Sequence, residues 1–153
     1  MTQLQTLDLA YIRITDLGLK HLRGMTQLRE LNLLGARITD AGLESLKGMT
    51  QLQALFLQLA PVNGRGLKYL KGLSRLQTLD LDGTHVDDAG LEHLKGLAKL
   101  QTLDLWRTQV TDAGLEHLRG PTQLQTLCIY NTKVTGAGVK RLRQALPNCN
   151  IPW

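Results

Sequence analysis

The chain has few aromatic residues, few cysteines and no long apolar run. Aromatic residues make up 4% of its 153 residues, and only one of them is phenylalanine. No stretch of about 18 consecutive apolar residues occurs, so the sequence predicts no membrane span. The N-terminal MTQLQTLDLA lacks the basic and apolar regions of a secretory signal. Cys128 and Cys149 form neither a disulfide framework nor a paired metal-binding spacing. We therefore expect a cytoplasmic protein with reduced thiols.

A repeat of 24 residues fills the chain instead. Six copies start at residues 1, 25, 49, 73, 97 and 121, and the segment 145–153 is left as a tail. Leucine or a close substitute recurs at positions 4, 7, 9, 14, 19 and 22 of each copy. Positions 6 to 9, such as TLDL at 78–81, alternate polar and apolar residues, which predicts a short strand with one buried face. Positions 16 to 23, as in DAGLEHLK, have helical spacing and predict a two-turn helix.

The predicted helix is bounded by residues that favour helix ends. Asp follows at position 16 in four copies, where a negative charge suits the helix N-terminus. Position 23 is basic in every copy, and Gly at position 24 in five of six predicts a left-handed helix end. Position 15 carries N-capping residues throughout: Thr15, Thr39, Asn63, Asp87, Thr111 and Thr135.

The pattern LxxLxLxxTxVTDAGLxxLKG resembles the leucine-rich repeat superfamily over the whole chain. It is most similar to the ribonuclease-inhibitor-like and F-box-associated kinds, and to short bacterial versions carrying TDAGL. The resemblance implies an α/β fold, a right-handed solenoid or horseshoe with a parallel β-sheet on its concave face and short α-helices on its convex face. It implies a single domain over residues 1–153, with six repeats over 1–144 and a C-terminal cap over 145–153.

Position 12 departs from the family pattern, which has an asparagine there. Thr84, Thr108 and Thr132 replace it in the last three copies, and we expect their hydroxyls to take over its hydrogen bonds. The first three loops carry Ile12, Ala36 and Ala60, so their backbone groups must find other partners.

The formal charge of +5 raises the question of nucleic-acid binding. Position 23 supplies a third of the basic residues, each with a local reason to stand at a helix end. Such a row along the convex edge could track phosphates, but no aromatic residue is interleaved with it, so nucleic acid is an unlikely partner. The predicted concave face is mixed, with Asp8, Glu30, Asp80, Asp82 and Asp104 against Arg13, Arg37, Arg107 and Lys133. It suits a basic or mixed-charge partner.

The third copy differs from the others, in the stretch QALFLQLAPVNGRGLKYL at 53–70. Phe56 is predicted to stand on the exposed face of its strand, and Trp106 and Tyr130 on the same side. Aromatic residues gathered with an arginine are typical of a recognition patch. The alternative is a drifting copy in which Pro61 and Gly64 are loop residues. The predicted partner-binding residues are Phe56, Asp80, Asp82, Asp104, Trp106, Arg107 and Tyr130.

Asp80 and Asp104 are expected to face each other across strands about 4.8 Å apart. Like charges that close favour a cation, a basic side chain or a shared proton, and two hydrated carboxylates are the alternative. His21, His93 and His117 share position 21, on helices about 10 Å apart, too far for most metal pairs. No HExxH motif, phosphate loop or nucleophile–base set occurs, so we expect neither enzyme activity nor a cofactor or metal.

The sequence therefore predicts a non-catalytic module that binds a protein or peptide on its concave face. A structural or assembly segment of a larger protein is the alternative. The tail is expected to add a last strand, with Cys149 and Ile151 inward, Cys128 outward, and Pro152 and Trp153 protecting the edge. The first strand has no polar cap, so we expect either a preceding part of a longer protein or a homodimer through the first repeat.

Overall fold

Six short parallel strands form one sheet in chain order. The computed structural model describes residues 3–119 and 123–153. Each strand residue pairs with the equivalent residue of the next copy, as Leu79 does with Leu103. This register confirms the predicted solenoid. Each strand ends at position 8, one residue earlier than expected. The strands are β1 (Thr6–Asp8), β2 (Glu30–Asn32), β3 (Ala54–Phe56), β4 (Thr78–Asp80), β5 (Thr102–Asp104) and β6 (Thr126–Cys128).

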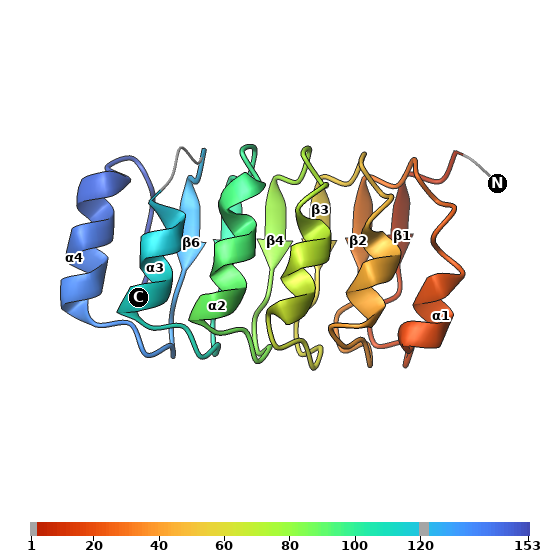
Figure 1. Ribbon diagram of the computed structural model, residues 1–153, viewed down its shortest axis with the longest axis horizontal. Coiled ribbons are helices and arrows are strands. Elements are labelled where there is room, and N and C mark those ends of the chain that lie inside the picture. Colours follow the sequence, from red (N-terminus) through yellow and green to blue (C-terminus); the bar gives the residue numbers. More distant parts are fainter. Residues whose placement is uncertain (1–2, 120–122) are drawn as a thin grey trace.

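Short helices cover one face of this sheet and leave the other face open (Figure 1). We call the helix-covered side the convex face and the open strand side the concave face. The α-helices are α1 (Asp16–Lys20), α2 (Asp88–Leu91), α3 (Asp112–Leu115) and α4 (Gly136–Ala145). The 3₁₀ helices are η1 (Gly42–Leu46), η2 (Arg65–Leu70), η3 (Glu92–Gly96) and η4 (Glu116–Leu118).

The helix predicted in every copy is present, but in copies two and three it is 3₁₀ throughout and not the α-helix that the family resemblance implied. In copies four and five a single α-helical turn continues as a 3₁₀ helix. Segments this short consist mostly of end turns, and end turns readily tighten to the 3₁₀ form.

The core is a single stack of leucines between the sheet and the helices. Leu31, Leu55, Leu79, Leu103 and Leu127 share position 7 and are fully buried. Truncating one of them would leave a cavity, because its neighbours above and below are fixed in the same stack.

The two ends of the stack differ. Leu4 and Ile12 of the first copy are 44% and 54% exposed, whereas the equivalent Leu28 and Ala36 are 0% and 2% exposed. At the other end the tail runs beside β6: Leu127 N–H donates to the Asn150 carbonyl at 2.9 Å. Ile151 is 3% exposed and Cys149 packs against the core, both inward as expected, but the expected last strand is only an isolated bridge between Thr126 and Asn150.

Aspartates at position 16 join successive copies. The N–H and hydroxyl of Thr111 both donate to Asp88, each at 2.7 Å, and Thr39 bonds Asp16 in the same way at 2.8 and 2.7 Å. Glycine at position 18 makes room for this contact, because a Cβ on Gly114 would overlap the Asp88 carboxylate. The repeat pattern predicted only the helix-end position of these aspartates, and not their bond to the next copy. Thr135 and Asp112 repeat the pair.

The joint between copies three and four lacks this bond. Copy three has Gly64 at position 16, with φ of 96°, so no carboxylate reaches the next copy. Asp87 instead accepts a bond from Gly90 N–H in its own helix, at 3.1 Å. A Cβ on Gly90 would lie 2.8 Å from the Gly64 Cα, so the two copies meet there through backbone alone.

The loops bend at position 11, whose φ is positive in every copy. The six residues there, with φ between 53° and 70°, are Tyr11, Gly35, Leu59, Gly83, Arg107 and Asn131. This bend lets the backbone N–H of position 11 donate to a backbone carbonyl of the next copy. Arg107 N–H, for example, donates to the Tyr130 carbonyl at 3.0 Å.

The predicted left-handed helix ends at position 24 are wrong. Gly24, Gly48, Gly72 and Gly96 have no positive φ, and Gly120 lies outside the described residues. The chain passes through these glycines in a 3₁₀-type turn, as when Leu97 N–H donates to the Leu94 carbonyl at 2.9 Å.

The threonines at position 12 do act in place of the family asparagine. The hydroxyls of Thr84, Thr108 and Thr132 each donate to the carbonyl of position 9 in their own copy, at 2.7 Å. In the first three loops the backbone N–H of position 12 bonds that carbonyl by itself. Ala36 N–H, for example, donates to Leu33 at 2.9 Å.

Candidate recognition site on the concave face

Strand alternation places the residues of position 8 on the concave face, because positions 7 and 9 on either side of them are buried. Phe56 pairs in register with Asp80, and Asp80 with Asp104. All three side chains are half-buried. Phe56 is therefore less exposed than the sequence predicted. The structure does bring these three predicted site residues into one row across β3, β4 and β5.

Acidic or amide side chains at position 8 also end the strands. Asp80 Oδ1 accepts a bond from Asp82 N–H at 3.0 Å, and Asp104 Oδ1 accepts one from Trp106 N–H at 2.8 Å. Asn32 Oδ1 accepts a bond from Leu34 N–H in the same way, at 3.1 Å. One carboxylate oxygen of each aspartate is thus used locally, and the second oxygen of Asp80 accepts a bond from Gln58. The recurrence of Asp and Asn at this position was the available signal for this turn.

Asp80 has the most perturbed surroundings on this face. Its pKa is raised from 3.8 to about 6, chiefly by burial and also by the neighbouring Asp104 and Asp82 carboxylates, against hydrogen bonds that lower it. One of those bonds comes from Gln58, whose Nε2 donates to Asp80 Oδ2 at 2.6 Å. The other amide atom, Gln58 Oε1, is buried without a partner. Gln58 was not among the predicted site residues, although its place in the unusual third copy pointed to it.

Arg107 is held by Asp82 in a two-point ion pair. Its Nε and Nη2 lie 2.9 and 2.7 Å from the two carboxylate oxygens, and Asp82 raises the pKa of Arg107. The same guanidinium lies over the Trp106 ring, 5.0 Å from its centroid. Arg107 therefore holds Trp106 in place, and its charge is paired with that of Asp82. Of the four basic residues expected on this face, Arg107 is thus the one whose charge is neutralised by an acidic side chain among the described residues.

Trp106 and Tyr130 supply the exposed aromatic surface of the site. Their side chains are 40% and 46% exposed, at position 10 of neighbouring copies. Cys128 lies beside Asp104 in the register, and burial raises the pKa of its thiol. The concave face thus presents two aromatic side chains next to a row that runs from Phe56 through two aspartates to a neutral thiol.

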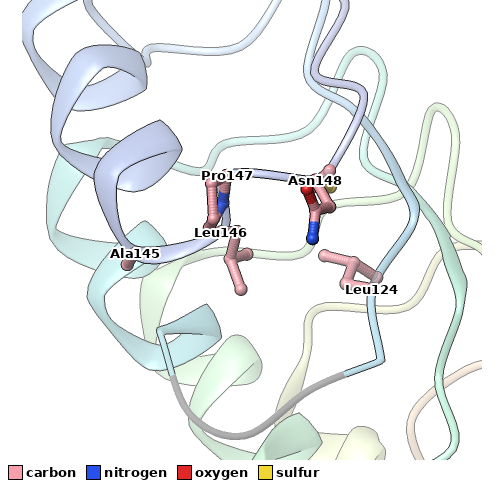
Figure 2. Close-up of a pocket in the computed structure, with 6 residues that line it drawn as sticks. Leu124, Ala145, Leu146, Pro147 and Asn148 are labelled. Carbon is pink, nitrogen blue, oxygen red and sulfur yellow. The ribbon is translucent and has the colours of Figure 1, made fainter.

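The C-terminal cap has a small hollow of its own (Figure 2). Leu124 and Leu146 lie on opposite sides of it, and Cys149 also lines it. Its volume is about 190 Å³, whereas small-molecule sites usually span about 300–1,000 Å³. We assign it no ligand.

Two properties of the described residues, 3–119 and 123–153, bear on function. No group of three or more His, Cys, Asp or Glu side chains in this part is placed to hold a metal ion. No helix in the same part is long and apolar enough to cross a membrane. His21, His93 and His117 are accordingly not drawn into a common site.

Two leucine-rich repeat family profiles match the chain. One describes two copies of the repeat and matches residues 2–48, and the other describes one repeat and matches residues 74–95. A search of curated protein sequences found no match. Together with the sheet and loop geometry, the matches show that the chain is a leucine-rich repeat protein.

Solved structures show the same fold. Internalin C2 of Listeria monocytogenes is 24% identical, with a TM-score of 0.80 over 99% of this chain and 62% of its own. A leucine-rich repeat protein of Leptospira interrogans is 23% identical, with a TM-score of 0.82 over 98% of this chain and 37% of its own. The plant peptide hormone receptor RGFR1, solved in complex with RGF2, is 15% identical, with a TM-score of 0.56 over 85% of this chain and 24% of its own. This chain thus spans less than two thirds of each.

Proposed function

We propose that this protein is a non-catalytic module that binds a protein or peptide on its concave face. The observation that carries the proposal is the fixed, exposed pair of Trp106 and Tyr130 beside the row of Phe56, Asp80 and Asp104. Tryptophan and tyrosine dominate the energetics of protein interfaces. A side chain already held in place loses little entropy on binding, and Arg107 holds Trp106 in this way.

The electrostatics of the site favour a basic group on the partner. Asp82 and Arg107 neutralise each other, so Asp80 and Asp104 are the charges left for an incoming residue. A lysine or arginine placed between them would favour the charged form of Asp80. The peptide hormone receptor structure, which has the same kind of repeat fold, supports a peptide as the kind of partner. A basic peptide segment fits the site best.

Affinity capture with paired variants tests the proposal. The double variant Trp106→Ala/Tyr130→Ala removes the exposed aromatic surface, and Lys20→Ala/Lys140→Ala changes two exposed convex residues as a matched control. We expect the partners bound by the wild type to be retained by the control and lost by the concave variant. An identical set of partners for all three proteins would favour a structural segment instead.

A second function, assembly, is favoured by the open end of the core. Leu4 and Ile12 are about half exposed at positions that are buried in the next copy. Because repeats of this shape bury one another, we propose that the first repeats of two copies meet across a twofold axis.

Sedimentation at several protein concentrations tests this assembly. We expect a dimer that dissociates on dilution, and a monomer for Leu4→Lys/Ile12→Lys. A wild type that stays monomeric at every concentration would contradict the assembly and leave the concave-face proposal intact.

The two free cysteines support a location in a reducing compartment such as the cytoplasm.

A further inference from the structure

A basic groove lies on the convex face, on the opposite side of the sheet from the proposed site. It has a volume of about 550 Å³ and is lined by Lys47, Lys68, Tyr69, Lys71 and Gly72. These residues come from the end of η1 and from η2 and the turn after it, and the two helices pack against each other. The groove therefore spans the joint between copies two and three.

No carboxylate lines this groove, and its lysines are available. Within the part of the chain that the structure describes, the ion pairs are Arg107–Asp82, Arg119–Glu116 and Arg141–Asp112, and none involves a groove lysine. Lys47, Lys68 and Lys71 are exposed. Three ammonium groups around one groove repel one another, and a bound anionic group would relieve that repulsion.

Tyr69 gives the groove an apolar floor. Its ring is half-buried and packs against the leucine core, and the Lys68 ammonium lies 5.0 Å from the ring centroid. The other copies carry His, Ser or Arg at this position, so the aromatic floor is specific to copy three. Gly72 keeps the groove open, because no side chain stands there.

We propose that this groove binds an acidic segment of a second protein. Carboxylates of the segment would pair with Lys47 and Lys71, and an apolar side chain between them would pack on Tyr69. A cation-lined groove with an aromatic floor suits such a mixed acidic and apolar segment. This is a second surface, separate from the concave face.

The neighbouring residues favour a short protein segment over a nucleic acid. The adjoining groove, which shares Lys71 and includes Lys95, is also lined by Glu92, which would repel a phosphate chain. Further along the row of basic residues, Arg119 is paired with Glu116, and Arg143 donates to the Ile151 carbonyl at 3.1 Å. Among the described residues, the unpaired cations of this row thus end at Lys95, beside Glu92, and do not run the length of the convex edge as a phosphate track would.

Fluorescence anisotropy with defined probes tests the proposal. The probes are a short labelled peptide of glutamate and leucine, the matching peptide of lysine and leucine, and a labelled oligothymidine. The groove variant is Lys47→Glu/Lys71→Glu, and the control is Lys20→Glu/Lys140→Glu, which changes the net charge equally on α1 and α4. Circular dichroism melting confirms that each variant is folded.

We expect the acidic peptide to bind the wild type and the control within about twofold of each other, and the groove variant at least about tenfold more weakly. Trp106→Ala/Tyr130→Ala should leave this binding unchanged, which separates the groove from the concave site. Equal weakening in the groove variant and the control would show a mere net-charge effect and overturn the proposal. Tighter binding of oligothymidine than of the acidic peptide, or no binding of the peptide, would also overturn it.

Discussion

Replacing Asp80 by asparagine is expected to stabilise the protein at neutral pH. The carboxylate of Asp80 is half-buried beside Asp104, so keeping it charged in the folded state costs free energy. Asparagine keeps the bond to the backbone N–H two residues on, as Asn32 shows at the same position of copy two. The bond from Gln58 Nε2 to Asp80 Oδ2 is lost, but a flip of the Gln58 amide lets the introduced amide N–H donate to Gln58 Oε1, which now has no partner.

The magnitude follows from the pKa of Asp80. A rise from 3.8 to about 6 corresponds to roughly 3 kcal/mol at full strength. Because the carboxyl is partly open to solvent, we expect about 1–2 kcal/mol at pH 7. The folded wild type binds this proton more tightly than the unfolded chain does. Its stability relative to Asp80→Asn therefore falls as the pH rises from about 4 to about 6.5.

Urea unfolding followed by circular dichroism at pH 4 and pH 7 measures this difference. Asp8→Asn is the control, because Asp8 makes the same bond to Ala10 N–H at 2.9 Å on the exposed first strand. We expect this control to stay within about 0.5 kcal/mol of the wild type at both pH values. A gain for Asp80→Asn that is equal at pH 4 and pH 7 would refute the reasoning, since it would not come from the charge.

Three further outcomes are expected. Leu103→Ala should cost about 2–5 kcal/mol as a core truncation, while Trp106→Ala should cost little stability, and a reversed order in urea unfolding would contradict the strand register. Asp88→Ala removes both bonds to Thr111 and should cost about 1–3 kcal/mol. An unchanged midpoint would show that the repeats are not joined there. Thiol titration of unfolded, unreduced protein should count both cysteines as free, and a count of zero would reveal a disulfide.

The strands and the core could be predicted because their signal is repeated in every copy. Leu79 and Leu103 lie in register because a fixed period leaves one way to stack the copies. The left-handed bend at position 11 could not be predicted, because residues as different as Tyr11 and Arg107 adopt it. It is imposed by the stacking of loops and not by local preference.

The site was predictable as a set of positions but not as a set of contacts. Phe56, Asp80 and Asp104 share one strand position, so their row follows from the register. The pairing of Asp82 with Arg107 depends on side-chain conformation around a bend that the sequence did not reveal. The helix-end aspartates lie where the sequence predicted, but their bonds to the next copy were not predictable, because those partners meet them only after stacking.

The chain carries one tyrosine on each of three surfaces, so photo-cross-linking can test the central claim directly. Tyr130 lies on the concave face, Tyr69 in the convex groove, and Tyr11 in the first copy, where it is 74% exposed. Each is replaced in turn by benzoylphenylalanine, the protein is irradiated in a cell lysate, and the cross-linked proteins are identified. Concave-face binding predicts a defined set of basic partner segments cross-linked from position 130 that is absent from positions 11 and 69. Cross-linking from positions 11 or 69 with none from position 130 would contradict it.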